Sequence, residues 1–160
     1  MTPPRFLADA MLGRLARWLR VIGCDTLHLP VDTPDAVLVR RAREEGRILL
    51  TRDRHLLREL RSARAMEILS EVPLEQLRQV VAACGLAPPA ELLCRCLLCN
   101  TELTTVAPDA VREQLPPSAR DLPGPVRRCP ACGRVYWRGS HARRMQAALE
   151  GALPGWLASR

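Results

Sequence analysis

The sequence predicts an α/β protein, in which a parallel sheet flanked by helices is followed by a small cysteine-rich unit. In the first 86 residues short apolar runs alternate with amphipathic segments, an order typical of parallel strands joined by right-handed crossovers. A proline-containing break at residues 87–89 ends this pattern, and beyond it large apolar residues become scarce while cysteine and proline become dense. We therefore expect an α/β domain at residues 1–90, a cysteine-rich unit with a C-terminal helix at 91–150, and a loose tail at 151–160.

The first two strands are predicted at residues 6–8 and 24–29. Between them lies a helix whose apolar face recurs at helical spacing and which Gly23 ends. Arg14, Arg17 and Arg20 recur every third residue on another face, which indicates a solvated surface or, alternatively, a track for backbone phosphates. A second helix is predicted to begin with Thr33 as its N-cap and to end at Gly46.

The third strand is the apolar run at residues 48–50, after which the chain turns polar at Thr51 and reaches Asp53. A short helix is predicted at 54–61 and a fourth strand at 65–69. Pro73 then begins a helix that Gly85 ends. In the second half the only clear element is a last helix, for which Ser140 is the predicted N-cap.

All 24 basic residues are arginine, and the formal net charge is +7. Without lysine the chain has no Walker A phosphate lysine and no Schiff-base nucleophile. Arginine offers planar, bidentate contacts to phosphate, which favours a nucleic-acid partner. Residues 94–160 hold 10 arginines and 5 acids, a net charge of +5, whereas residues 1–93 have a net charge of +2. The C-terminal part is therefore expected to attract a polyanion more strongly. Aromatic residues are too few for a base-stacking sheet of the RRM type.

Targeting signals and membrane spans are not expected. No stretch approaches the roughly 18 apolar residues of a membrane span, and the first residues lack the apolar core of a signal peptide. Seven cysteines without such a signal indicate a reducing compartment, in which thiols bind metal or pack in cores. We therefore expect a cytoplasmic protein.

Two Cys-x-x-Cys pairs indicate a zinc site, formed by Cys96, Cys99, Cys129 and Cys132. Four thiolates complete the tetrahedral set that Zn²⁺ prefers and leave no position for water, so the predicted zinc is structural. Cys94 is an alternative to Cys96. Zinc binding at such sites contributes about 10–16 kcal/mol, enough to fold a segment with little core of its own.

Three aspartates are predicted to meet at one edge of the sheet. Asp9 ends the first strand, Asp53 ends the third, and Asp35 begins the helix between them. Each has an alternative role as a helix cap. Carboxylates about 5 Å apart repel by roughly 3 kcal/mol at an effective dielectric constant of 20, so such a cluster needs a cation. Hard oxygen ligands suit Mg²⁺ or Mn²⁺, which can orient a phosphodiester and activate water against it.

Three segments resemble a known family, namely residues 6–20 (FLADAMLGRLARWLR), 47–53 (RILLTRD), and 132–137 (CGRVYW) with 139–141 (GSH). They are similar to the Mut-seven C-terminal RNase domain, a PIN-like ribonuclease fold followed by a zinc ribbon, and the resemblance extends from about residue 5 to 150. It implies metal-dependent cleavage of RNA with Asp9, Asp35 and Asp53 as the metal-binding acids. PIN nucleases often carry a fourth acid, for which Asp25 and Asp32 are weak candidates.

The expected RNA contacts are Arg14, Arg17, Arg52, Arg54 and His141. Tyr136 and Trp137 either pack the ribbon onto the main domain or offer a stacking surface for a base. The alternative function is a catalytically inactive RNA- or ribosome-binding module whose acids act only as caps. A phosphatase of the aspartyl-phosphate type is disfavoured because it needs an acid two residues after its nucleophile, where this chain has Met11.

Overall fold

The computed structural model describes residues 3–59 and 64–158. Four short strands, β1 (Phe6–Ala8), β2 (Thr26–His28), β3 (Ile48–Thr51) and β4 (Ala65–Glu67), form a parallel sheet in the order β2-β1-β3-β4. Ala8 is in register with His28 on one side and with Leu50 on the other, and Thr51 is in register with Glu67. All four strands therefore end at one edge, which we call the carboxyl edge.

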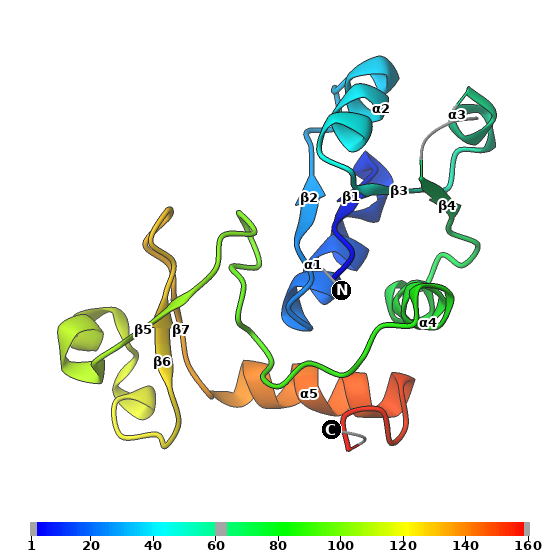
Figure 1. The fold of residues 1–160 in the computed structure, drawn as a ribbon. Helices are drawn as coiled ribbons and strands as arrows, with labels where there is room; N and C mark the ends of the chain where they lie inside the picture. Colours follow the sequence, from blue (N-terminus) through cyan, green and yellow to red (C-terminus); the bar gives the residue numbers. More distant parts are fainter. Residues whose placement is uncertain (1–2, 60–63, 159–160) are drawn as a thin grey trace.

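The two faces of the sheet are covered by different helices, because alternate residues of a strand point to opposite sides. Phe6, Ala8 and Leu50 pack with α1 (Gly13–Val21) and α4 (Pro73–Cys84). Leu7 and Leu49 pack with α2 (Asp35–Glu44) and α3 (Arg54–Glu59) on the other side. Figure 1 shows α1 and α4 below the sheet and α2 and α3 above it. The predicted parallel α/β sheet is thus confirmed.

The cysteine-rich unit contains a small antiparallel sheet of β5 (Thr104–Val106), β6 (Val126–Arg128) and β7 (Val135–Tyr136). Two 3-10 helices, Pro108–Gln114 and Pro117–Ala119, fill the long connection between β5 and β6. Its own apolar cluster is small and is centred on Val111, Leu115 and Val126. So small a core agrees with the expectation that this unit depends on metal.

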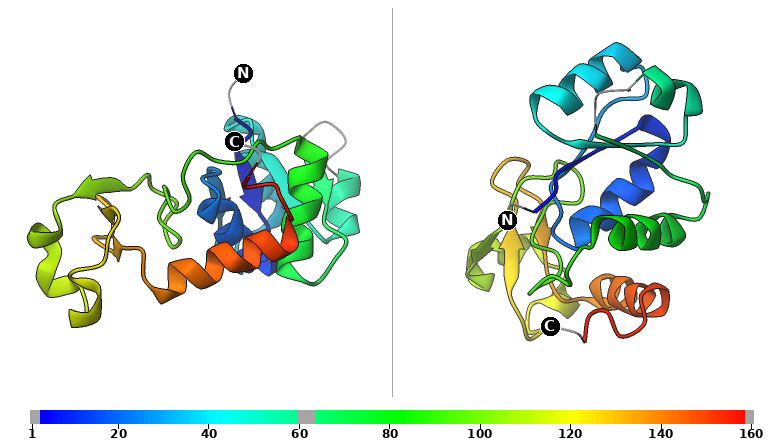
Figure 2. Two further views of the ribbon diagram at one scale, coloured as in Figure 1. Left: turned by 90° about the horizontal axis from the view of Figure 1, so that it is seen from below. Right: turned by 45° about the vertical axis from the view of Figure 1, so that its right-hand side comes forward.

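The last helix, α5 (Ser140–Ala152), extends from the ribbon back to the α/β sheet unit, where Leu149 joins the main core. Both views of Figure 2 show this return. The tail expected at 151–160 is instead packed as far as the structure describes it. Trp156 donates a hydrogen bond of 3.1 Å from Nε1 to the carbonyl of Leu86, and Leu157 is 8% exposed.

Several predicted helix ends differ by one or a few residues. The N-cap of α2 is Pro34 rather than Thr33, and that of α5 is Gly139 rather than Ser140, and neither makes a side-chain cap bond. A 3-10 turn over Ala10–Leu12 precedes α1. The helix predicted at 54–61 is seen as far as Glu59, and its last two residues lie outside the described part.

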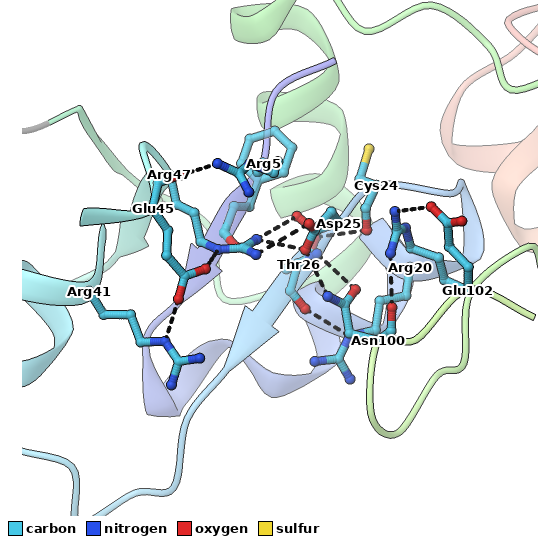
Figure 3. Close-up of polar contacts among 12 residues, drawn as sticks. Arg5, Arg20, Cys24, Asp25, Thr26, Arg41, Glu45, Arg47, Asn100 and Glu102 are labelled. Carbon is cyan, nitrogen blue, oxygen red and sulfur yellow. Dashed lines mark hydrogen bonds and ion pairs between the residues drawn. The ribbon is translucent and has the colours of Figure 1, made fainter. Parts of the chain in front are cut away.

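A buried polar network joins the cysteine-rich unit to the sheet at the edge opposite the carboxyl edge (Figure 3). Arg20 donates hydrogen bonds to the carbonyls of Thr26 at 2.9 Å, Leu97 at 2.8 Å and Leu98 at 2.9 Å. Asn100 accepts from the backbone N–H of Thr26 at 2.9 Å. The first cysteine pair is therefore held against α1 and β2 by hydrogen bonds with partners more than 70 residues away.

Arg20 does not belong with Arg14 and Arg17 on a solvated or phosphate-binding face. It is 5% exposed. A step of three residues turns about 60° backward around an α-helix, so Arg20 lies about 120° away from Arg14. The regular spacing in the sequence therefore conceals a buried arginine with a structural role.

Asp25 is the acid at the centre of the same network. Arg47 binds it in a bidentate manner, with Nη1–Oδ1 at 2.6 Å and Nη2–Oδ2 at 3.2 Å, and Asn100 donates to Oδ1 at 2.7 Å. Burial alone raises the pKa of Asp25, but the hydrogen bonds from Arg47 and Asn100 outweigh it and lower the pKa below its ordinary value of 3.8.

Replacing Asp25 by Asn is expected to destabilise the protein by roughly 1–3 kcal/mol at pH 7, because a buried guanidinium loses a charged partner. Because the pKa is lowered in the folded state, this contribution is complete above the unfolded pKa of 3.8 and is lost as the pH falls through the folded pKa. Urea unfolding between pH 7 and pH 3 measures the difference, with the exposed Asp32→Asn as a matched control. A difference that does not shrink below pH 4 contradicts this assignment.

Candidate active site and metal centre

Asp9 lies at the carboxyl edge, directly after β1. Its backbone N–H donates to the carbonyl of Leu50 at 3.0 Å, so the residue continues the pairing with β3. Its carboxylate Oδ2 accepts a hydrogen bond of 2.8 Å from the hydroxyl of Thr51. The alternative role as a helix cap is not observed, because the 3-10 turn that follows has no side-chain cap bond. The carboxylate is thus aimed at the end of the neighbouring strand.

Asp53 follows β3 and is connected to Asp9 through Thr51. The hydroxyl of Thr51 accepts a bond of 3.0 Å from the backbone N–H of Asp53 while it donates to Asp9. The Asp53 carboxylate does cap α3, since its Oδ1 accepts from the N–H groups of His55 at 2.7 Å and Leu56 at 3.3 Å. Within residues 3–59 and 64–158 both capping bonds end on Oδ1, so Oδ2 is left for another partner.

Asp35 is the exposed first residue of α2, which follows β2 after a loop at residues 29–34. In the described part of the chain, the only set of three or more metal-ligating side chains whose ligand atoms all lie within 4.8 Å of one another is a set of cysteines. The three aspartates therefore do not form a tight set. The physical reason is that Asp53 is turned onto its own helix and Asp35 is held in the first turn of α2.

Thr51 is a residue of the candidate site that the sequence prediction missed. It is completely buried, and its one hydroxyl joins the Asp9 side chain to the Asp53 backbone. The signal in the sequence was a lone hydroxyl at the end of a buried apolar strand.

Glu67 is a second residue that the sequence prediction missed. It ends β4 in register with Thr51 and so lies at the carboxyl edge. Asp25, a weak candidate for a fourth acid, is wrong because it precedes β2 at the opposite edge.

Two of the expected RNA-binding arginines already have acidic partners. Arg52 pairs with Glu71 at 2.9 Å, and Arg54 pairs with Glu67 at 2.8 Å. Both pairs include a side chain more than three-quarters exposed, and exposed ion pairs of this kind exchange readily with other anions. The fifth expected contact, His141, is exposed in the first turn of α5.

Arg14 and Arg17 are exposed and have no acidic partner among the described residues. They line a hollow of about 480 Å³ that extends from Met11, two residues after Asp9, to Leu98 in the first cysteine pair. His28, at the end of β2, also lines this hollow and bonds through Nε2 with the carbonyl of Ala10 at 3.1 Å. Positive charge therefore continues from the carboxyl edge toward the ribbon.

The cysteine set has the size of a zinc site. The sulfur atoms of Cys96 and Cys132 are 3.6 Å apart, and those of Cys99 and Cys129 are 3.4 Å apart. Four sulfurs at 2.3 Å from a tetrahedral zinc lie about 3.8 Å from one another. Cys94 is outside the set, and its thiol donates to the carbonyl of Glu91 at 3.4 Å, so the cluster contains Cys96 rather than Cys94.

The thiols differ in how readily they ionise. Burial opposes ionisation of Cys96, but hydrogen bonds from the Cys99 backbone and the Tyr136 hydroxyl outweigh it and lower the pKa to about 6. The pKa of Cys132 is raised to about 11: its hydrogen bond with the Arg134 backbone favours the thiolate, but hydrogen bonding with the other three cysteines, together with desolvation, outweighs it. Four adjacent thiolates therefore require a cation, and Zn²⁺ fits this donor set.

Tyr136 packs the ribbon onto the main core rather than offering a stacking surface. Its hydroxyl lies 3.2 Å from the sulfur of Cys96 and accepts a hydrogen bond of 3.0 Å from the N–H of Leu97. Trp137 is half-buried against the apolar cluster of the ribbon. Both neighbours therefore take part in packing, Tyr136 against the main core and Trp137 against the ribbon cluster.

These features define a class of protein: a parallel α/β sheet with acids at its carboxyl edge, followed by a four-cysteine site that can hold zinc. The model of the Mut7-C RNAse domain family matches residues 4–149, and the chain belongs to this family. Membership points to a ribonuclease-type function with RNA as substrate or partner. No curated protein and no solved structure matches the chain significantly. In the part of the chain that the structure describes, no helix is long and apolar enough to cross a membrane.

Proposed function

We propose that this protein is a divalent-metal-dependent ribonuclease of the PIN-like type that hydrolyses phosphodiester bonds of RNA at the carboxyl edge. The main support is the contact between Asp9 and Asp53 through Thr51. The Thr51 hydroxyl binds one oxygen of the Asp9 carboxylate and the backbone N–H of Asp53. The Asp53 carboxylate uses one oxygen to cap α3. The second oxygen of each carboxylate is left for a ligand.

Asp9 and Asp53 are proposed as the two principal ligands of a Mg²⁺ or Mn²⁺ ion, with Asp35 as the third acid. Such an ion supplies Lewis acidity and positive charge for hydrolysis of a phosphodiester. Thr51 positions Asp9 by its hydrogen bond of 2.8 Å, and so fixes the direction of the carboxylate. Asp35 is assigned this place because it begins α2 at the carboxyl end of β2.

Arg14 and Arg17 are proposed to hold RNA phosphates along the 480 Å³ hollow, since they are exposed and carry no described acidic partner. Such contacts add affinity without reading sequence. Arg52, Arg54 and His141 are assigned secondary contacts. Arg52 and Arg54 exchange their acidic partners for phosphate.

The cysteine-rich unit is proposed to be a structural zinc ribbon that aids RNA binding. We place the nuclease domain at residues 1–90 and the ribbon with its helix at 91–150. All seven cysteines are free thiols in the described structure, which supports a reducing compartment, and we assign the cytoplasm.

The test is a cleavage assay on single-stranded RNA with the zinc-loaded protein. Cleavage is expected when Mn²⁺ or Mg²⁺ is added and is expected to be absent when both are omitted, at unchanged zinc content. Equal cleavage with and without the added ions excludes the proposed metal dependence. Absence of cleavage under all conditions, with RNA binding retained, supports the second candidate, an inactive RNA-binding module. That candidate is favoured by one observation, the capping role of Asp53.

A further inference from the structure

A groove of about 660 Å³ lies where the segment at residues 90–93, the loop at 122–125 and the start of α5 meet. Val21, the last residue of α1, contributes to its wall. Gly13, the first residue of α1, lies at the other end of that helix, close to Asp9. Because eight residues of an α-helix span about 12 Å, the groove is separate from the carboxyl edge. Neither the aspartates nor the hollow beside Arg14 contributes to it.

We propose that this groove is a second RNA-binding subsite, in which one unpaired base stacks on Trp137 and the flanking phosphates bind Arg138 and Arg143. All three side chains line the groove. The inference rests on the proposed function, because it takes RNA as the partner and adds where a single strand is held away from the site of cleavage.

Trp137 is fixed in a position that suits stacking. It packs against the cluster of Val111, Leu115 and Val126, so that it does not need to be ordered when a base arrives. A Cβ at Gly139 would lie 2.6 Å from the indole nitrogen of Trp137, so glycine at this position leaves room for the ring. In the described part of the chain no buried side-chain nitrogen lacks a partner, and no hydrogen bond of the indole N–H is seen, so this nitrogen is not fully buried.

The charge in the groove comes from Arg138 and Arg143, which have no carboxylate partner in the described structure. A Cβ at Gly124 would lie 2.8 Å from Cδ of Arg138, so the aliphatic stem of this arginine crosses the backbone of the loop where glycine leaves space. Gly124 has a φ of +107°, which other residues rarely adopt. A third arginine, Arg127, is engaged by the carbonyls of Leu92 and Leu93 and by Glu91. Two cations therefore remain for an anionic ligand.

An aromatic face beside free guanidinium groups is the combination that binds single-stranded nucleic acid, because each base offers a π-face and each linkage a negative charge. A base within a duplex is stacked on both faces and cannot also stack on Trp137, so the occupant is an unpaired segment. An acidic peptide would satisfy the arginines but would leave the tryptophan without a planar partner.

The test is equilibrium binding of a labelled single-stranded 12-mer of oligouridylate by the full, zinc-loaded chain without added Mg²⁺ or Mn²⁺. Replacing Trp137 by Leu is expected to weaken binding roughly 10-fold, while Trp137→Phe stays within about 3-fold of wild type. A plot of the logarithm of the association constant against the logarithm of the salt concentration falls with increasing salt. Arg138→Gln is expected to make this fall less steep by about 0.7. Arg78→Gln, at an exposed position of α4 outside the groove, is the matched charge control.

An oligomer of the same length without bases separates stacking from charge. Wild type and Trp137→Leu are expected to bind it equally. If Trp137→Leu weakens binding of both oligomers alike, or of neither, or if Arg138→Gln leaves the salt slope unchanged, the subsite is overturned. Binding of an acidic peptide with the same dependence on Trp137 also overturns it. If wild type cleaves RNA while these variants bind normally, the second RNA-binding subsite is overturned and the proposed nuclease function is retained. If RNA binding depends on Trp137 but added Mn²⁺ brings no cleavage, the proposed nuclease function is overturned and the subsite is retained.

Discussion

Replacing Asp9 by Asn is expected to lower the rate of Mn²⁺-dependent RNA cleavage at least about 100-fold while leaving the fold intact. The amide oxygen of Asn can still accept the hydrogen bond from Thr51, which is 2.8 Å long in the structure, so the side chain keeps its direction. What is lost is the negative charge that would attract and hold the ion. The expected result is therefore a loss of turnover without a loss of stability.

Asp53→Asn is expected to behave in the same way, and it separates the catalytic role from the capping role. Asn is as good an N-cap as Asp, so the bonds to the backbone N–H groups of His55 and Leu56 can be kept. Asp53→Ala removes the cap as well and is expected to cost about 1 kcal/mol of stability in addition. If only Asp53→Ala reduced cleavage, capping rather than metal binding would account for this residue.

The measurement is the initial rate of RNA cleavage as a function of Mn²⁺ concentration, with the melting temperature of each variant determined in parallel. Asp109→Asn is a suitable control, because Asp109 is an exposed acid in the ribbon, outside the carboxyl edge, and its substitution removes the same charge. RNA binding without added metal is expected to remain within a few-fold of wild type in all variants. Undiminished cleavage by both Asp9→Asn and Asp53→Asn would eliminate the proposed active site.

Replacing Cys129 by Ser is expected to abolish stable zinc binding and to unfold the ribbon. The thiol is completely buried, and the apolar cluster of this unit has only three fully packed residues at its centre. Zinc binding at such sites contributes about 10–16 kcal/mol, whereas the net stability of a whole domain is about 5–15 kcal/mol. The cluster therefore cannot replace the metal.

The effect is expected to extend into the α/β unit. Arg20 is buried and donates to the carbonyls of Leu97 and Leu98, so loss of the first cysteine pair would leave a guanidinium with only one of its three carbonyl partners. Leaving such a group unpaired costs roughly 3 kcal/mol, which lowers the melting temperature by about 6–12 °C in a protein of this size.

Zinc content and thermal unfolding measure the outcome. Cys94→Ser is the matched control, since Cys94 is close in sequence but lies outside the thiolate set. It is expected to retain one zinc per chain and a melting temperature within a few degrees of wild type. A zinc-loaded Cys129→Ser variant with normal stability would mean that this thiolate is not a ligand.

Local patterns predicted well wherever a single segment decides its own structure. The buried runs at Phe6–Ala8 and Ile48–Thr51 became adjacent parallel strands, and Gly23, Gly46 and Gly85 stand at the helix ends with positive φ. The Cys-x-x-Cys pairs identified the four thiols that converge, because a tetrahedral thiolate site imposes its own spacing. Helix starts were less accurate, since Thr33 and Ser140 are each one residue from the true boundary.

The candidate active site was predicted only in part. That Asp9 and Asp53 lie at one edge follows from strand order, but Thr51 as the link between them depends on which strands pair and in which register. Asp35 as the third acid is still a prediction. Arg52 and Arg54 were correctly placed near the acids but carry the ion pairs with Glu71 and Glu67, which no local pattern reveals.

The sequence by itself determined the alternation of strands and helices, the four cysteines that cluster and the family, because each depends on residues close together or on fixed ligand chemistry. Only the tertiary structure decided that Arg20 and Asp25 connect the two units by hydrogen bonds and that Trp137 lines a groove with Arg138. The reason is physical: burial and hydrogen-bond partners come from segments more than 70 residues apart in the case of Arg20 and Asp25. A periodic pattern along the chain does not show which distant segments come into contact in the folded protein.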